Sequence, residues 1–310
     1  MKVCFVGLGS IGKRHINNLK FLCESRSIEL EVHALRSTNR KLENEIEEIV
    51  SKIINSVDEL DNDYDVVFIT NPTALHYESI KLFSNKAKNM FIEKPLFHST
   101  EFNLNDLKLN SEGIYYIAAP MRYTNVISAL KEIIRNEDVY SVRNICSSYL
   151  PNWRKGVDYR EVYSAKKELG GGISLDCIHE WDYLVYLFGY PEEVFNIQGK
   201  FSHLEIDSDD ISIYIAKYKD KLVELHLDYI GRSDRREIEL YCKEGTITGD
   251  FIKNEVRFTD GRETIKFEND DDEIYIRELE NFLEMILNNR ENTNDINKAL
   301  EVLKIAEGEK

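Results

Sequence analysis

The sequence lacks the features that mark secreted and membrane-spanning proteins. Its five cysteines are odd in number, widely spaced and include no C-x-x-C pair: Cys4, Cys23, Cys146, Cys177 and Cys242. We therefore expect free thiols in a reducing compartment, and neither a disulfide framework nor a zinc site. No apolar run approaches the ~18 residues that cross a bilayer, and the apolar start is too short for a signal peptide. The expected location is the cytoplasm.

Positive charge and clustered metal ligands are also scarce. The chain has 40 Lys and Arg against 56 Asp and Glu, a formal net charge of -16. This balance argues against a nucleic-acid partner and against attraction to an anionic membrane, because both depend on basic residues. Five of the histidines are scattered and form no metal-ligand cluster, so no metal site is expected: His33, His76, His98, His203 and His226.

What is present is the composition of a globular protein. Of 310 residues, 42% are hydrophobic and 31% are charged, which is enough for a substantial core in one or two domains. Over the first 120 residues, short apolar runs alternate with helical patterns. The runs are 2–6, 29–35, 65–70, 89–93 and 114–118, and the helical segments are 11–22, 39–51 and 74–83. This alternation predicts a doubly wound parallel sheet with helices on both faces.

The pattern changes near Pro120. Residues 124–135 follow a helical period, and period-two alternation then predicts strands around 211–215, 223–229 and 238–240. Two helices close the chain, the second capped by Asn294 or Asp295. We therefore predict an α/β domain over 1–120 and an α+β domain over 121–310 with a mainly antiparallel, open-faced sheet. The closing helices are candidates to pack back on the first domain.

A glycine-rich loop follows the first predicted strand. It reads Gly7-x-Gly9-x-x-Gly12 and opens a helix within a βαβ unit, which is the context that a dinucleotide-binding motif requires. The glycines allow a tight turn and close backbone approach, so that a pyrophosphate binds at the helix N-terminus. We predict a Rossmann domain in which Gly7, Gly9, Ser10, Ile11 and Gly12 contact the cofactor. The alternative is a purely structural glycine turn.

The end of the second predicted strand bears on the choice of cofactor. NAD-selective sites usually place an acid there, which accepts a hydrogen bond from the ribose 2′-hydroxyl. Here the chain has Arg36 and Ser37 and no acid. A guanidinium matches a 2′-phosphate in charge and geometry, so NADP(H) is favoured over NAD(H). Alternatively, Arg36 stacks on the adenine and discriminates little.

A second glycine-rich segment, which starts at Glu168, introduces a predicted amphipathic helix that ends at Gly189. Asp176 and His179 are three residues apart and would share one helical face, which Asp182 continues. An Asp beside a His fixes the tautomer of the ring and raises its basicity, as general acid–base chemistry requires. Taken alone, His179 is equally explained as a partly buried histidine with its hydrogen bonds satisfied.

The segment that leads into these glycines is locally basic in an acidic protein. It interleaves aromatic and cationic side chains: Trp153, Arg154, Lys155, Tyr159, Arg160, Tyr163, Lys166 and Lys167. Aromatic faces bind sugar rings or bases, and arginine binds phosphate or carboxylate. We interpret it as a loop for an anionic sugar, with Trp153, Arg154 and Tyr159 as contacts. A solvated or subunit-contact loop, or extra cofactor phosphate contacts, are the alternatives.

The ordered set of motifs resembles the glucose–fructose oxidoreductase/inositol dehydrogenase (Gfo/Idh/MocA) family over nearly the whole chain. The resemblance rests on five pieces: the Gly7 loop, TNPTALHYE at 70–78, EKP at 93–95, MRY at 121–123 and the GGG…D…H…D helix. By itself, a lysine such as Lys94 at a strand end is usually solvated. The resemblance instead implies that Lys94 is the catalytic lysine, with a Lys94–Pro95 bond that is often cis in the family.

The resemblance also implies further site residues. The cofactor cleft would be lined by Thr70, Asn71, Pro72, His76, Glu93 and Lys94. Substrate would be contacted by Arg122, Tyr123, Asp176 and His179. One departure concerns Asp176, because many members have four residues from that Asp to that His where this chain has three. The spelling LDxxHExDYL looks similar to members linked to surface-polysaccharide and sugar-nucleotide pathways.

Together these features predict an NAD(P)-dependent oxidoreductase that transfers a hydride between nicotinamide and a sugar or nucleotide-sugar carbon. Lys94 would polarise the oxygen and relay its proton, and His179 would act as the acid–base group with Asp176 orienting it or binding a hydroxyl. The resemblance implies a homodimer or homotetramer. Two rival hypotheses are a non-catalytic dinucleotide-binding sensor and an enzyme that uses transient oxidation for elimination.

Overall fold

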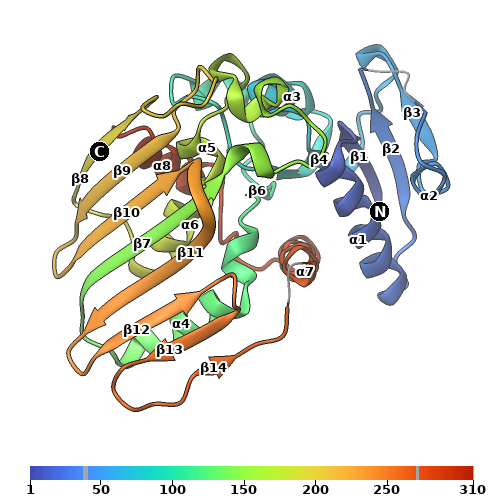
Figure 1. Ribbon diagram of the computed structural model, residues 1–310. Coiled ribbons are helices and arrows are strands. Elements are labelled where there is room, and N and C mark those ends of the chain that lie inside the picture. The colour runs from blue at the N-terminus through green and yellow to red at the C-terminus, as the bar shows by residue number, and fades with distance from the viewer. Residues whose placement is uncertain (38–40, 270–271, 310) are drawn as a thin grey trace. The chain divides into compact units, whose positions relative to one another are not determined.

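The computed structural model describes residues 1–37, 41–269 and 272–309 (Figure 1). The chain forms two compact units. The first comprises residues 1–118 and 272–300, and the second comprises residues 119–271 and 301–310. Among the described residues, no helix is long and apolar enough to cross a membrane.

The first unit is built on a six-stranded, wholly parallel sheet. Its strands are β1 (Lys2–Val6), β2 (Glu31–Leu35), β3 (Lys52–Ile54), β4 (Tyr64–Ile69), β5 (Ala87–Ile92) and β6 (Tyr115–Ile117). Their order is β3-β2-β1-β4-β5-β6, so the order reverses between β1 and β4. The apolar runs lie in these strands because residues buried on both faces of a parallel sheet must be hydrophobic. The predicted parallel α/β architecture is confirmed.

Helices α1 (Ser10–Ser25), α3 (His76–Phe83) and α7 (Glu273–Asn288) accompany this sheet, with a short α2 (Asn44–Glu47). The prediction of a helix over 39–51 is wrong for most of its length, and residues 38–40 lie outside the described part. Only Ile46 is buried in α2. Strand β3, which was not predicted, begins at Lys52. It forms because the β-branched Ile53 and Ile54 pair with β2.

Aromatic rings from α7 and from three strands meet in the core of the first unit. Phe5 and Phe68 stack with 4.4 Å between ring centroids, and Phe91 lies 5.3 Å from Phe68. Phe282 of α7 packs edge-on against Phe91 at 5.4 Å. Helix α7 thus packs on one face of the N-terminal sheet (Figure 1).

The second unit contains an eight-stranded sheet. Its strands are β7 (Val139–Tyr149), β8 (Glu193–Gly199), β9 (Ile211–Lys217), β10 (Leu222–Asp228), β11 (Ile230–Cys242), β12 (Thr246–Asp250), β13 (Glu255–Phe258) and β14 (Ile265–Lys266). The order is β14-β13-β12-β11-β7-β10-β9-β8. All neighbours are antiparallel except β7 and β10. The mainly antiparallel sheet was predicted, but β7, β8 and β12 to β14 were not assigned.

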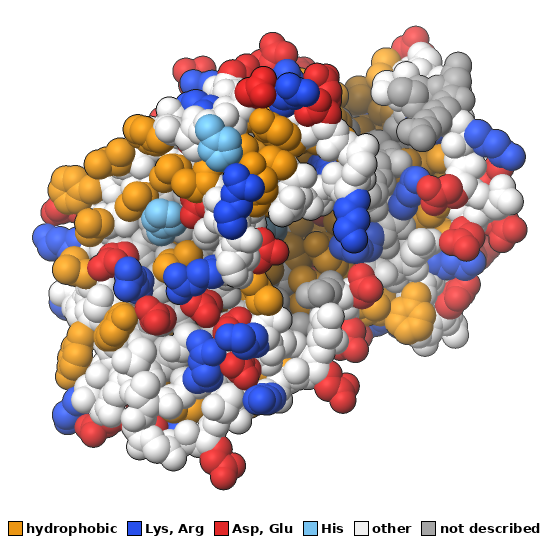
Figure 2. Space-filling view, viewed as in Figure 1, with side chains coloured by type: hydrophobic (Ala, Val, Ile, Leu, Met, Phe, Trp, Pro, Cys, Tyr) orange, Lys and Arg blue, Asp and Glu red, His pale blue; other side chains and the backbone are white. Residues whose placement is uncertain are grey.

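Helices α4 (Asn125–Ile133), α5 (Ile173–Asp176) and α6 (Ile178–Phe188) cover one face of this sheet (Figure 1). Trp181 of α6 lies edge-on against Tyr214 of β9, with 5.3 Å between ring centroids. On β9, buried and exposed residues alternate, so the opposite face is open as predicted. Figure 2 shows hydrophobic side chains gathered on that face over β8 and β9.

The last helix, α8 (Ile296–Ala306), begins at a capped end. Asp295 Oδ1 accepts hydrogen bonds from the amides of Asn297 at 2.9 Å and Lys298 at 3.0 Å. Asp295 is therefore the cap, and the Asn294 amide instead donates to the Ile117 carbonyl. Single 3-10 turns complete the described secondary structure at 57–59, 73–75, 104–107, 120–123, 134–136, 150–152, 159–161, 163–165 and 167–169.

Candidate functional site

The glycine loop has the close contacts that its spacing predicts. Gly7 has a φ of +88°, and a Cβ on it would lie 2.9 Å from Asn71 Cα. A Cβ on Gly12 would lie 2.7 Å from the Gly7 carbonyl oxygen and 2.8 Å from Thr70 Oγ1. Thr70 Oγ1 donates to the same Gly7 carbonyl at 2.7 Å. The two outer glycines are thus required for packing β1, α1 and β4 together.

Gly9 differs, because no atom lies within 4 Å of the position that its Cβ would take. It faces a cavity of about 500 Å³ lined by residues 7–10, 36, 37 and 41–43 and by Lys13. Gly9 is also the N-cap of α1, whose first turn carries no acidic residue. Unpaired amides at a helix N-terminus favour an anion, so this concavity fits a dinucleotide pyrophosphate.

Cationic side chains surround the same cavity. Arg36 follows β2 and is held by its amide, which donates to the Ile54 carbonyl at 2.9 Å. Lys41 is exposed and forms no ion pair within the described part of the chain. Lys13 is paired with Glu43 at 2.6 Å. Ser37 also lines the cavity, so the structure brings the predicted Gly loop, Arg36 and Ser37 together.

His76 connects the loop after β4 with the loop after β5. Its Nε2 faces the Asn71 carbonyl at 3.0 Å, and its Nδ1 faces the Pro95 carbonyl at 3.0 Å. The ring is buried, and burial lowers its pKa although the carbonyls oppose that shift. Asn71 is held further by its side-chain amide, which donates to Ser79 Oγ at 2.8 Å. His76 therefore shapes the two loops through their backbones.

Lys94 lies two residues after the end of β5 and is half-buried. The Lys94–Pro95 peptide bond is cis, as the resemblance led us to expect. Its neighbour Glu93 is buried and accepts a hydrogen bond from His15 Nε2 of α1 at 2.5 Å. Burial by itself raises the pKa of Glu93, but the bond and charge from His15 outweigh it and the net pKa is lowered. Glu93 thus anchors the segment that carries Lys94.

In the second unit, the predicted continuous helix over Asp176 and His179 is wrong. The helix is interrupted at Cys177, where α5 ends and α6 begins. Asp176 is the last residue of α5, so the two side chains do not share one regular helical face. The start of α5 is fixed by Asp209, whose Oδ2 accepts from the Ser174 amide at 2.9 Å. Asp209 comes from the loop before β9, and no local sequence pattern pointed to it.

Asp176 is buried and held by tyrosines. The hydroxyl of Tyr229 donates to Asp176 Oδ2 at 2.5 Å. Burial and the charge of Asp176 raise the pKa of Tyr229, so this hydroxyl stays protonated and remains a donor. Tyr163 is 38% exposed, but desolvation of its hydroxyl and the charge of Asp176 raise its pKa as well. The ring of Trp153 lies edge-on to Tyr229 at 5.2 Å, so the structure brings Trp153 and Asp176 into one group.

Arg122 and Asp182 form a buried bidentate ion pair, which the sequence analysis did not foresee. Arg122 Nε and Nη2 donate to the two carboxylate oxygens of Asp182 at 2.8 and 2.7 Å. The guanidinium also lies over the ring of Tyr186 at 5.0 Å. Asp182 thus fixes the turn 120–123 against α6. Tyr123 and His179 are half-buried within this unit.

The basic loop is partly neutralised by its neighbours. Arg160 pairs with Asp158 at 2.7 Å and with Glu205 at 3.3 Å. The hydroxyl of Tyr159 accepts from the Glu205 amide at 3.1 Å, which ties the loop to the segment before β9. Arg154 is exposed, with its guanidinium 5.4 Å from the ring centre of Tyr163. Arg154 therefore belongs with the Asp176 group, whereas Tyr159 is held at Glu205.

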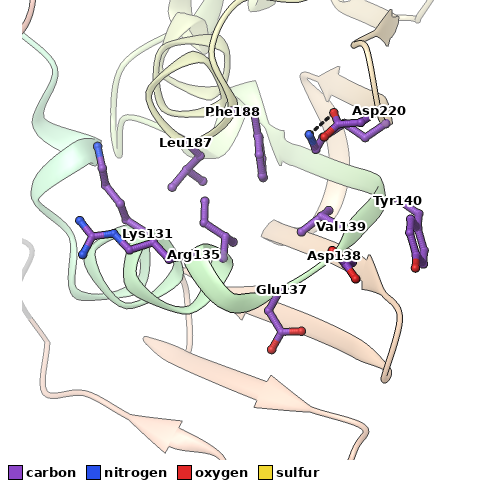
Figure 3. Close-up of a pocket in the computed structure, with 11 residues that line it drawn as sticks. Lys131, Arg135, Glu137, Asp138, Val139, Tyr140, Leu187, Phe188 and Asp220 are labelled. Carbon is purple, nitrogen blue, oxygen red and sulfur yellow. Dashed lines mark hydrogen bonds and ion pairs between the residues drawn. The ribbon is translucent and has the colours of Figure 1, made fainter.

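A second cavity of about 520 Å³ lies in the second unit away from these residues. Figure 3 shows Leu187 and Phe188 pointing into it from α6, with Lys131 and Arg135 from the α4 region on one side and Asp220 on another. Its lining mixes three basic and three acidic residues, and Asp220 is already paired with Lys221. No predicted site residue lines it, and its mixed charge favours no ligand class.

Two models of known protein families match this chain, one in each of its two units. A model of the oxidoreductase family with an NAD-binding Rossmann fold matches residues 1–108, and a model of the GFO/IDH/MocA C-terminal domain matches residues 127–248. The myo-inositol 2-dehydrogenase of Thermotoga maritima is 25% identical over 273 residues, which span 82% of this chain and 76% of that enzyme.

Solved structures share the fold over nearly the whole chain. A levoglucosan dehydrogenase in complex with NADH and levoglucosan has a TM-score of 0.84 at 17% identity, covering 99% of this chain and 95% of that one. The WlbA dehydrogenase from Bordetella pertussis, in complex with NADH and UDP-GlcNAcA, has a TM-score of 0.80 at 17% identity, covering 99% and 94%. With both family models matched, the chain belongs to the Gfo/Idh/MocA family of oxidoreductases, whose N-terminal domain is an NAD-binding Rossmann fold.

Proposed function

We propose that this protein is an NAD(P)-dependent dehydrogenase or ketoreductase of a sugar or nucleotide sugar. The observation that carries the proposal is the cradle at the carboxyl end of β1, where Gly9 opens onto a cavity beside the N-terminus of α1. Family membership and the myo-inositol dehydrogenase of Thermotoga maritima support a polyhydroxylated substrate.

In the proposed reaction, the cofactor exchanges the hydride and the side chains handle the proton. The Gly7–Gly12 loop would hold the pyrophosphate of the cofactor, whose nicotinamide would supply hydride exchange with a carbinol or keto carbon. Lys94 polarises the substrate oxygen and passes its proton, because it follows β5 at the same carboxyl edge of the sheet. His179 serves as, or assists, the acid–base group. Asp176, fixed by Tyr229, orients His179 or accepts a bond from a substrate hydroxyl.

The preferred cofactor in this proposal is NADP(H). Arg36 and Lys41 line the cavity on the side of β2, and no carboxylate follows β2 to accept the 2′-hydroxyl of NAD. Glu43 is the one acid in the lining, and Lys13 already pairs with it. Both cations thus lie where a 2′-phosphate would be bound, and a reductive direction follows from that preference.

The substrate is proposed to be anionic, with a nucleotide-activated sugar of cell-surface carbohydrate biosynthesis as the preferred class. Trp153 offers an exposed aromatic face close to the group around Asp176, and Arg154 adds an exposed cation. The WlbA structure, which contains UDP-GlcNAcA, shares the fold and supports this class. Arg122 contributes by holding Asp182 and the turn that leads to Tyr123.

We further propose that the protein is a homodimer or homotetramer joined through the open face of the second sheet. Four large apolar side chains are exposed there on two adjacent strands: Phe195, Ile197, Ile213 and Ile215. An exposed apolar patch of this kind marks an interaction surface in soluble proteins. A self-complementary face leads naturally to a closed twofold assembly.

Turnover of Lys94→Ala tests the catalytic proposal. Oxidation or reduction of cofactor is followed with a panel of nucleotide sugars and free sugars, and cofactor affinity is followed by thermal shift. Lys94→Ala should lose at least about a hundredfold in kcat with nearly unchanged cofactor affinity. The matched control is Lys88→Ala, because Lys88 is an exposed lysine on β5 paired with Asp65 at 2.9 Å and should behave as wild type when replaced.

Two outcomes would contradict the proposal. Normal turnover by Lys94→Ala would remove the lysine from the mechanism. Cofactor binding by the wild type without turnover of any substrate in the panel would favour the non-catalytic sensor. An enzyme that works by transient oxidation would instead retain tightly bound cofactor through purification and catalyse elimination without net cofactor turnover.

A further inference from the structure

Three metal-ligating side chains converge inside the second unit. Cys146 lies on the central strand β7, Cys177 lies at the break between α5 and α6, and Glu180 lies in the first turn of α6. All three are buried, and their donor atoms lie within 4.8 Å of one another. The two Sγ atoms are 3.6 Å apart. In the sequence these residues are separated by up to 34 positions, so no local spacing motif indicated a metal site.

The sulfur separation fits a shared metal ion. Two thiolates on one tetrahedral Zn²⁺, with Zn–S bonds of about 2.3 Å, lie about 3.8 Å apart. A disulfide bond would require the same atoms to approach to about 2.05 Å. The observed 3.6 Å is therefore close to the metal-bound separation. All three donor atoms lie within 4.8 Å of one another, so no separation must shorten by more than about 1 Å, which side-chain rotation can supply.

Glu180 provides a second, independent observation. Its side chain is fully buried, and its Oε1 accepts from Arg236 Nε at 2.7 Å. Its Oε2 is also buried but has no hydrogen-bond partner among the described residues. A buried carboxylate oxygen without a partner is costly, because it has lost its hydration without replacement. A cation bound between this oxygen and the two sulfurs would supply the missing partner.

The charge of the cluster is compatible with a divalent ion. Arg236 and Glu180 neutralise each other, and the two thiols are uncharged when protonated. Binding one Zn²⁺ releases two thiol protons, one from each cysteine, so the net charge of the buried cluster does not change. Soft thiolates with one carboxylate favour Zn²⁺ over Mg²⁺ or Ca²⁺, which prefer all-oxygen sites.

We propose that Cys146, Cys177 and Glu180 bind one Zn²⁺ per chain as a structural site. With water as a fourth ligand, the ion ties the central strand β7 to the junction between α5 and α6. Asp176 and His179 flank that junction, directly before Cys177 and two residues after it. The metal thus acts as a positioning element for the Asp176 region and takes no part in hydride transfer. This inference does not depend on the proposed function.

Direct metal analysis of the whole protein tests the proposal. Protein purified with a reductant and stripped by a chelator is incubated with Zn²⁺, freed of excess ion and analysed for bound metal. Co²⁺ serves as a spectroscopic probe, because thiolate–cobalt bonds give intense near-ultraviolet absorption. We expect about one ion per chain, a thiolate–cobalt band, and a rise in Tm with Zn²⁺ but not with Mg²⁺.

Variants identify the ligands. Cys146→Ser, Cys177→Ser and Glu180→Gln should each weaken Zn²⁺ binding by at least about tenfold. Cys242→Ser is the matched control, because Cys242 lies on β11 outside the cluster and should leave binding unchanged. Near-ultraviolet circular dichroism establishes that each variant is folded, and the wild-type stoichiometry stands even where a variant is not.

Two results would contradict the proposed zinc site. One is reduced wild-type protein that holds no stoichiometric Zn²⁺ or Co²⁺. The other is unchanged binding in a folded Cys177→Ser variant. If air-oxidised protein loses two hydrogen atoms by mass while reduced protein binds no metal, the cysteines are a disulfide-forming pair and the metal proposal is wrong.

Discussion

His15 and Glu93 form a buried pair in which Nε2 lies 2.5 Å from Oε1, and this bond ties helix α1 to the segment that carries Lys94. The glutamate is next to the proposed catalytic lysine, and the histidine lies one turn after the glycine loop. One hydrogen bond thus links the helix that follows the glycine loop with the segment after β5 that holds Lys94.

We predict that Glu93→Gln lowers the free energy of unfolding by about 2 kcal/mol at neutral pH, because a buried bond to a charged group is weakened. The pKa of Glu93 is lowered in the folded state, below its ordinary value of 4.5. Its stabilising contribution is therefore full above that pH and is lost as the pH falls through the folded pKa.

Urea denaturation of both proteins between neutral and acidic pH measures this effect. The gap between wild type and Glu93→Gln should shrink only below about pH 4.5. The control is Glu31→Gln, since Glu31 bonds His33 at 2.9 Å from an exposed position and should cost little. A gap that stays constant down to acid denaturation would contradict the charged state assigned to Glu93.

Two substitutions in the glycine loop should affect cofactor binding and stability differently. Gly9→Ala should leave the free energy of unfolding within about 0.5 kcal/mol of wild type, because its Cβ would meet no atom within 4 Å. It should nevertheless weaken binding of NADP(H) and NAD(H) at least about tenfold, because the methyl group would occupy the space for the pyrophosphate.

Gly12→Ala is the matched comparison. Its Cβ would lie 2.7 Å from the Gly7 carbonyl oxygen, so we expect a loss of about 1–3 kcal/mol in the absence of cofactor. Chemical denaturation and cofactor titration together distinguish the two variants. Full cofactor affinity in a folded Gly9→Ala protein would mean that the dinucleotide does not pass over Gly9.

The buried pair of Arg122 and Asp182 is predicted to be strongly coupled. Asp182→Ala removes both carboxylate bonds from a buried guanidinium and should cost about 3–5 kcal/mol. Removing both side chains should cost less than the sum of the single changes, which a double-mutant cycle measures. The exposed pair of Arg135 and Glu132, 2.6 Å apart, provides a control cycle with coupling near zero. Additive losses at Arg122 and Asp182 would show that the bidentate pair does not persist in solution.

The open sheet face predicts an assembly that charge would disrupt. Ile197 and Phe195 are 72% and 68% exposed on the edge strand β8. Ile197→Asp together with Phe195→Asp should convert the oligomer to a monomer in light scattering, with each unit still folded. Phe21→Asp is the control, since Phe21 is 58% exposed on α1 of the first unit and should leave the assembly intact. A monomeric wild type would remove the basis of this prediction.

The sequence was sufficient where one residue pattern determines one local structure. Buried parallel strands need continuous apolar runs, so β1, β2, β4, β5 and β6 were found, and the spacing of Gly7, Gly9 and Gly12 is needed by the turn itself. The sequence did not predict local structure that depends on tertiary contacts. The helix at Asp176 and His179 is interrupted at Cys177, and side chains from distant segments hold the part before the break, Asp209 at Ser174 and Tyr229 at Asp176.

The same reason explains the site residues that were missed. Tyr229 ends a period-two strand pattern and was assigned only to the sheet, because nothing nearby shows that its hydroxyl meets Asp176. The bond between Asp182 and Arg122 joins residues 60 positions apart. Pairings across such distances become visible only when the fold places both elements, so a single sequence does not reveal them.

Helix α7 has a consequence for how the chain is made. It is synthesised after the whole of the second sheet, yet Phe282 packs against Phe68 and Phe91 in the core of the first unit. The nascent N-terminal sheet therefore emerges from the ribosome with one aromatic face uncovered. Roughly 150 further residues must be synthesised before α7 can cover that face, although domains generally fold in order from the N-terminus. During that interval a chaperone or another nascent chain can reach the rings that α7 later covers.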